Sequence, residues 1–148
     1  MNPVVFLPGE GERIEAGAST AIMKATAETT CGAFSVSEAT FPAGTNGPPP
    51  HAHSYTTDTF YVLEGTLHMT VGDREIDASA GSYVLVPPGV VHTFANISDE
   101  PVRFLNISAP GGLEKYLRDL ADAMRSGTVP GTPDFAAIAA KYDFTVVT

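Results

Sequence analysis

The chain has 148 residues and a formal net charge of -9 at pH 7, with eight lysines and arginines against seventeen aspartates and glutamates. A domain of this length buries enough surface to fold without disulfides, so we expect one domain. Nucleic acids and anionic membranes are bound through clustered lysines and arginines, and we therefore expect no nucleic acid and no membrane among its partners.

Glycine and proline divide the first two thirds of the chain into short segments that predict β-strands. Residues 31–41 alternate in part between apolar and serine positions, which is typical of a strand. Residues 66–71 alternate more clearly, and a two-residue hairpin turn of Gly72 and Asp73 follows them. The other segments that predict strands are residues 4–7, 59–65, 74–78, 82–89, 92–97 and 102–108. No helical pattern separates them, which favours a β-sandwich or barrel over a parallel sheet.

Helical spacing replaces this pattern after Pro110. Apolar residues then recur on one face of an expected helix: Leu113, Tyr116, Leu117, Leu120 and Met124. Arg125 lies in the last turn of this helix, and Gly127 follows as a C-terminal stop.

A second helix is expected near the C-terminus, with Thr132 as its cap and Pro133 at its first position. A segment of about forty residues makes a poor independent core. We therefore expect a β domain at residues 1–110 and, at residues 111–148, a helical extension of the same domain. The extension would pack outside the β domain or cover a partner subunit.

Two histidines follow a run of three prolines. His51 and His53 are two residues apart, so both imidazoles project from the same face if the backbone is extended. That geometry suits a metal ion. Asp58 would bring a carboxylate to the same place if the polar stretch of residues 54–57 bends.

A third imidazole is available from His92, which follows a turn built from Pro87, Pro88 and Gly89. The face of the strand that carries His92 also carries Phe94 and Asn96. We therefore expect an aromatic ring and an amide to line the cavity beside the histidine. His68 lies in neither of these segments, and we leave it out of the metal site.

These residues resemble the two sequence motifs of the cupin superfamily. The first motif is His-x-His, an acid and a glycine, and it reads His51, His53, Asp58 and Gly65 here, with aspartate where the family has glutamate. The glycine that opens this motif is displaced by one position, at Gly44. The second motif is matched completely, by Gly81, Pro87, Gly89, His92 and Asn96. The helical tail is similar to the tails of single-domain, quercetin-dioxygenase-like cupins.

The resemblance implies an all-β cupin jelly-roll barrel, also called a double-stranded β-helix, with two C-terminal α-helices packed outside. It also implies one divalent transition metal ion, held by His51, His53, His92 and Asp58. Imidazole nitrogens suit Fe, Mn, Ni, Co, Cu or Zn better than Ca or Mg. Because aspartate is one methylene shorter than glutamate, Asp58 either binds the ion directly or acts through a water.

Three functions are compatible with this interpretation. The one we favour is a dioxygenase that uses O2 on an enolisable or phenolic, flavonol-like substrate, with Asp58 as the catalytic base and Phe60, Phe94 and Asn96 in the substrate pocket. The alternatives are a metal-dependent Lewis-acid isomerase, cyclase or lyase, and a non-catalytic small-molecule-binding cupin.

Assembly and location follow from simpler features. An open sheet edge and the apolar residues 4–7 need covering, which favours a homodimer. The single cysteine, Cys31, cannot form an internal disulfide, and no cationic leader opens the chain. We therefore expect a cytoplasmic protein.

Overall fold

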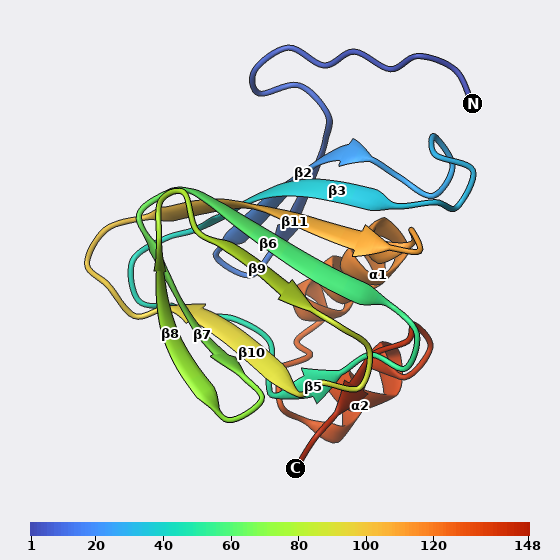
Figure 1. The fold of residues 1–148 in the computed structure, drawn as a ribbon. Coiled ribbons are helices and arrows are strands. Elements are labelled where there is room, and N and C mark those ends of the chain that lie inside the picture. Colours follow the sequence, from blue (N-terminus) through green and yellow to red (C-terminus); the bar gives the residue numbers. More distant parts are fainter.

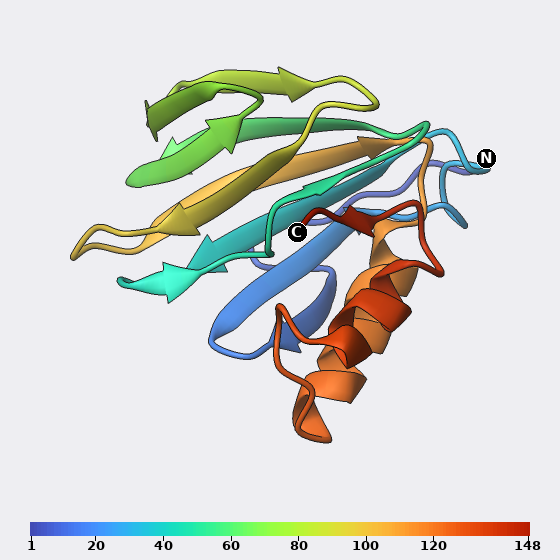
Figure 2. The same cartoon turned by 90° about the horizontal axis from the view of Figure 1, so that it is seen from below.

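The computed structural model describes residues 1–148 as two antiparallel β-sheets that face each other, with two helices against one side of them (Figures 1 and 2). The first sheet has the order β1-β2-β3-β11-β6-β9 and the second β12-β5-β10-β7-β8, with β4 paired to β10. The strands are β1 (Glu12–Ala16), β2 (Ser19–Ala25), β3 (Ser35–Phe41), β4 (Thr45–Asn46), β5 (His51–Ala52), β6 (Thr57–Glu64), β7 (Thr66–Val71), β8 (Arg74–Ser79), β9 (Tyr83–Val86), β10 (His92–Asn96), β11 (Val102–Ala109) and β12 (Thr145–Val146). This is the jelly-roll arrangement that the sequence predicted.

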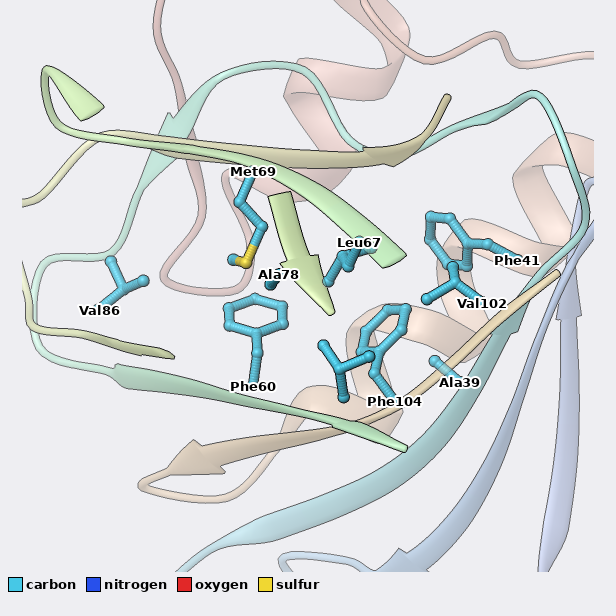
Figure 3. Close-up of a cluster of buried hydrophobic side chains, with 10 residues drawn as sticks. Ala39, Phe41, Phe60, Leu67, Met69, Ala78, Val86, Val102 and Phe104 are labelled. Atoms are coloured by element: carbon cyan, nitrogen blue, oxygen red, sulfur yellow. The ribbon is translucent and has the colours of Figure 1, made fainter. Parts of the chain in front are cut away.

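Apolar side chains from both sheets fill the space between them (Figure 3). On β7, Leu67 and Met69 are fully buried, while the intervening His68 is only partly so, as the alternation predicted. The buried cluster consists of Ala39, Phe41, Phe60, Val62, Leu67, Met69, Ala78, Val86, Val102 and Phe104. Burying a side chain the size of Phe60 contributes roughly 1.5–3 kcal/mol, so this cluster holds the two sheets together.

In the N-terminal third, two predictions were wrong and two strands were missed. The apolar residues 4–7 form no strand and are exposed. The expected strand at residues 31–41 starts only at Ser35, and Cys31 lies before it as an exposed residue with a φ of 53°. The strands β1 and β2 were not predicted, because each has only one buried side chain, Ile14 and Met23 respectively.

Both predicted helices are present, as α1 (Leu113–Arg125) and α2 (Pro133–Ala139). The hydroxyl oxygen of Thr132 accepts a hydrogen bond from the backbone N–H of Phe135, which confirms the predicted cap. The helices lie outside the sheets, and α1 packs against β1 (Figure 2). Neither helix is long and apolar enough to cross a membrane.

The short strand β12 follows the helices and returns to the second sheet. It pairs with β5, so that Val146 lies opposite His51. No pattern in the sequence predicted this strand. Its consequence is that the C-terminal residues of the chain lie beside the predicted metal ligands.

Candidate metal centre

The four predicted ligands meet at one place between the sheets. His51, His53, Asp58 and His92 each offer a ligand atom, and these atoms all lie within 4.8 Å of one another. His51 and His92 are a directly opposed pair on β5 and β10, while Asp58 projects from β6 in the other sheet. The spacing of the two sequence motifs therefore places all four residues together.

The proline run that precedes His51 is fixed against β10. The hydroxyl of Thr93 donates to the carbonyl of Pro48 over 2.6 Å. Gly47 passes so close to β10 that a Cβ atom there would lie 2.0 Å from the carbonyl oxygen of Phe94. A side chain at Gly47 is therefore excluded, and the segment that leads to His51 lies directly against β10.

Each imidazole has one nitrogen committed to the protein backbone. The Nδ1 atoms lie near carbonyl oxygens, which are those of Pro49 for His51 (2.9 Å), Asp143 for His53 (2.5 Å) and Val90 for His92 (3.1 Å). A carbonyl oxygen only accepts hydrogen bonds, so each Nδ1 carries the hydrogen. The lone pair of each neutral imidazole then resides on Nε2, the atom that is left for a metal ion.

Asp58 faces two of these nitrogens from the opposite sheet. Its Oδ1 accepts a hydrogen bond from the amide of Asn106 at 2.6 Å. Its Oδ2 lies 3.2 Å from Nε2 of His92 and 3.6 Å from Nε2 of His53. A carboxylate oxygen and the lone pairs of neutral imidazoles repel one another, so this contact is favourable only with a positive charge between them, which is either an extra proton on an imidazole or a bound cation. The residues present fit a divalent transition metal ion.

The pKa values of the site show which groups favour a charged form and which favour a neutral one. Burial raises the pKa of Asp58, but hydrogen bonds that its carboxylate accepts from His53 and His92, when their imidazoles carry a second proton on Nε2, outweigh burial and leave that pKa below its usual range. Burial, and after it the neighbouring His92, lower the pKa of His51 to about 3, so His51 is neutral at pH 7. For His53, burial lowers the pKa, but Asp58 and the carbonyl of Asp143 raise it by more.

A largely apolar cavity of about 160 Å³ opens beside the ligands. His51, His53 and Asp58 lie in its wall, and so do aromatic residues of the C-terminal part of the chain such as Tyr116 and Phe135. No lysine or arginine lines it. The cavity therefore suits a neutral or aromatic ligand better than an anion.

The three residues expected in the substrate pocket occupy different places. Phe94 lines the cavity, whereas Phe60 is fully buried in the core cluster. The amide of Asn96 faces away from the cavity and donates to three backbone carbonyls, those of Phe41, Pro42 and Glu100. Asn96 therefore ties the end of β10 to its neighbouring loops.

Three residues that contact the ligands were missed in the sequence. Asn106 holds Asp58, Asp143 holds His53, and Phe144 stacks on His51. Asn106 had a usable signal, because it is an amide at an inward position of a strand, between Phe104 and Ser108. Asp143 and Phe144 had none, because they follow a helix and lie in neither motif.

Comparison with known proteins agrees with this geometry. Residues 37–108 match the cupin domain family. The chain is also 30% identical over 131 residues to quercetin 2,3-dioxygenase of Bacillus subtilis (strain 168). The chain belongs to the cupin superfamily. The alignment covers 88% of this cupin but only 38% of the relative, so the chain spans well under half of that protein.

Solved structures show the same fold. KdgF from Halomonas sp. superposes on this cupin with a TM-score of 0.66 and 13% identity, over 77% of this chain and 99% of that one. An RmlC-like cupin from Shewanella frigidimarina NCIMB 400 gives a TM-score of 0.65 and 20% identity, over 77% and 96% of the two chains. At these identities the likeness concerns the fold and not the reaction.

Proposed function

We propose that this cupin is a metal-dependent dioxygenase that acts on an enolisable or phenolic, flavonol-like substrate. The observation that carries the proposal is a group of three histidines and one carboxylate beside an apolar cavity that no lysine or arginine lines. The relative named quercetin 2,3-dioxygenase supports the choice of reaction. A cavity with this lining accepts an aromatic ring, and its carboxylate favours a neutral ligand over an anionic one.

The metal ion would be held by His51, His53 and His92, with Asp58 beside it. A divalent transition metal, one of Fe, Mn, Ni, Co, Cu or Zn, supplies Lewis acidity and, where it is redox-active, one-electron chemistry. The chain fixes the ligands before the ion binds, because every Nδ1 atom is already bonded to a carbonyl oxygen.

Asp58 is the base in this proposal. Its lowered pKa keeps the carboxylate ionised at neutral pH, and Asn106 fixes Oδ1. Oδ2 is then the oxygen that accepts the proton of the substrate hydroxyl as the substrate binds. The apolar wall, which includes Phe94 and Phe104, excludes water from the reacting atoms.

Oxygen consumption tests the proposal. The purified protein should contain about one transition metal ion per chain and should consume O2 when quercetin or another enolisable phenol is added. His51→Ala should abolish both metal retention and O2 consumption. His68→Ala is the matched control, because His68 pairs with Asp77 at 2.8 Å outside the site and should leave both properties unchanged.

The same experiment separates the alternatives. Substrate turnover that proceeds unchanged without O2 would contradict the dioxygenase and favour a Lewis-acid isomerase, cyclase or lyase. A protein that holds no metal and binds ligands equally well after His51→Ala would be a non-catalytic small-molecule-binding cupin.

We also propose that two copies form a homodimer. The strand β9 is an edge of the first sheet, and it exposes Tyr83 (63%) and Leu85 (48%). Residues 4–7 of the same chain are apolar and exposed. An open strand edge and an apolar segment are complementary surfaces, so a second copy would cover both.

We propose a cytoplasmic location as well, because the unpaired Cys31 fits the reducing cytoplasm.

A further inference from the structure

Asp143 contacts His53 through its backbone and residues 54–56 through its side chain. Its carbonyl oxygen accepts the hydrogen bond from Nδ1 of His53 over 2.5 Å. Its carboxylate accepts four more hydrogen bonds from the three residues that follow His53. The donors are the backbone N–H groups of Ser54 (2.6 Å), Tyr55 (3.1 Å) and Thr56 (2.9 Å) and the hydroxyl of Thr56 (2.7 Å). One residue therefore holds the turn that separates the ligands His53 and Asp58.

This turn decides whether the ligand set can form. In a straight strand, residues five apart project to opposite faces, so His53 and Asp58 would point away from each other. The bend at residues 54–56 brings both into the same site. The three N–H groups of the bend point at a single carboxylate, and without it they would lose their partners.

Phe144 contacts the remaining histidine on β5. Its ring stacks on His51 with centroids 3.8 Å apart and planes 7° apart. The same ring packs against Tyr116 of α1 at 4.9 Å and Phe135 of α2 at 6.1 Å. Rings thus lie in contact from the two helices to a metal ligand.

Backbone pairing holds this segment in place. The strand β12 pairs with β5, and the N–H of Val147 donates to the carbonyl of Pro50 over 2.8 Å. The segment of residues 143–147 is therefore docked on the residues that immediately precede and include the histidine pair.

We propose that residues 143–147 are a working part of the metal centre, with Asp143 and Phe144 as positioning residues for His53 and His51. Because the segment holds the ligands in the geometry that binds the ion, metal binding and docking of the segment stabilise each other. The inference rests on the proposed metal site but not on the dioxygenase reaction.

Titration with Co²⁺ tests this coupling without any substrate. Asp143→Ala removes the carboxylate but keeps the backbone carbonyl, and it should weaken Co²⁺ binding by about 10–100-fold, as loss of a group that orients a metal ligand typically does. The visible absorption spectrum of bound Co²⁺ should also change, because the ligands are no longer fixed. Asp143→Asn keeps one acceptor oxygen, so its affinity for Co²⁺ should lie between those of the wild type and Asp143→Ala.

Asp119→Asn is the matched control. The carboxylate of Asp119 accepts a hydrogen bond from the hydroxyl of Tyr142, the residue directly before Asp143, and contacts no ligand. This variant should bind Co²⁺ as the wild type does. An equal loss in Asp119→Asn and Asp143→Ala would overturn the proposal, because the carboxylate of Asp143 would then have no specific role.

Hydrogen exchange on the unmodified chain gives a second measurement that does not depend on the folding of a variant. Addition of Co²⁺ should slow exchange at residues 145–147, and most clearly at the N–H of Val147. Unchanged exchange would overturn the coupling even if Co²⁺ binds normally. A wild-type protein that binds no Co²⁺ would overturn the metal centre itself, so the two failures are distinguishable.

Discussion

Two buried asparagines have different roles, one in the candidate metal centre and one in the surrounding fold. Asn106 donates to Asp58 at 2.6 Å, whereas Asn96 donates to three backbone carbonyls away from the cavity. Both are at least nine-tenths buried, at 8% and 1% exposure. The same side chain therefore supports a proposed ligand in one place and loop structure in the other.

Substitution of each asparagine by alanine should give opposite results. We expect Asn106→Ala to weaken Co²⁺ binding by about tenfold in a calorimetric titration, because Asp58 loses its orienting donor. We expect Asn96→Ala to lower the free energy of unfolding by about 1–3 kcal/mol in urea, because buried carbonyls lose their donor, and to leave Co²⁺ binding unchanged. Weakened Co²⁺ binding in both variants would contradict this division of roles.

The residues of the site differ in how far the sequence could predict them. His51, His53, Asp58 and His92 were predicted because two short motifs carry them, and the structure brings their ligand atoms together. Asp143 lies 90 residues from His53, and no local pattern records a hydrogen bond over that distance. Contacts made by a backbone carbonyl are also independent of residue type, so composition gives no signal for them.

Among the elements, those with strong periodicity were predicted more accurately than those with weak periodicity. The strand β7 and the helix α1 bury one clear face, and both were found from sequence. On β3 the inward face carries the buried serines Ser35 and Ser37, so hydrophobic alternation gives little information there. The two-residue strands β4, β5 and β12 are too short to show any period.

The strand β6 offers a test of which face carries the core. Phe60 is fully buried between the sheets, while its neighbour Tyr61 is 40% exposed on the other face. We expect Phe60→Ala to lower the free energy of unfolding by about 3–5 kcal/mol, because it leaves a cavity in the core. Tyr61→Ala should change it by less than about 1 kcal/mol. Urea unfolding of the two variants measures the difference, and equal losses would mean that the strand is placed with the wrong register.

At the scale of the whole molecule, the exposed apolar surface is what most requires a partner. Leu85 lies on the open edge strand β9, and Ile97 is a comparably exposed residue (67%) in the loop after β10. We expect Leu85→Lys to convert a dimer into a monomer in light scattering, because a charge would be buried at the proposed interface. Ile97→Lys should leave the dimer intact. A monomeric wild type would contradict the proposed dimer directly.

The opposed pair of His51 and His92 makes the centre sensitive to how its strands align. A shift of β10 by one residue against β5 would turn His92 to the opposite face and leave only two imidazoles together. A chain with this shifted register would not bind the ion, and only chains with the native register would gain the stability that the bound ion contributes. The metal would thus favour the native strand register in addition to its part in the reaction.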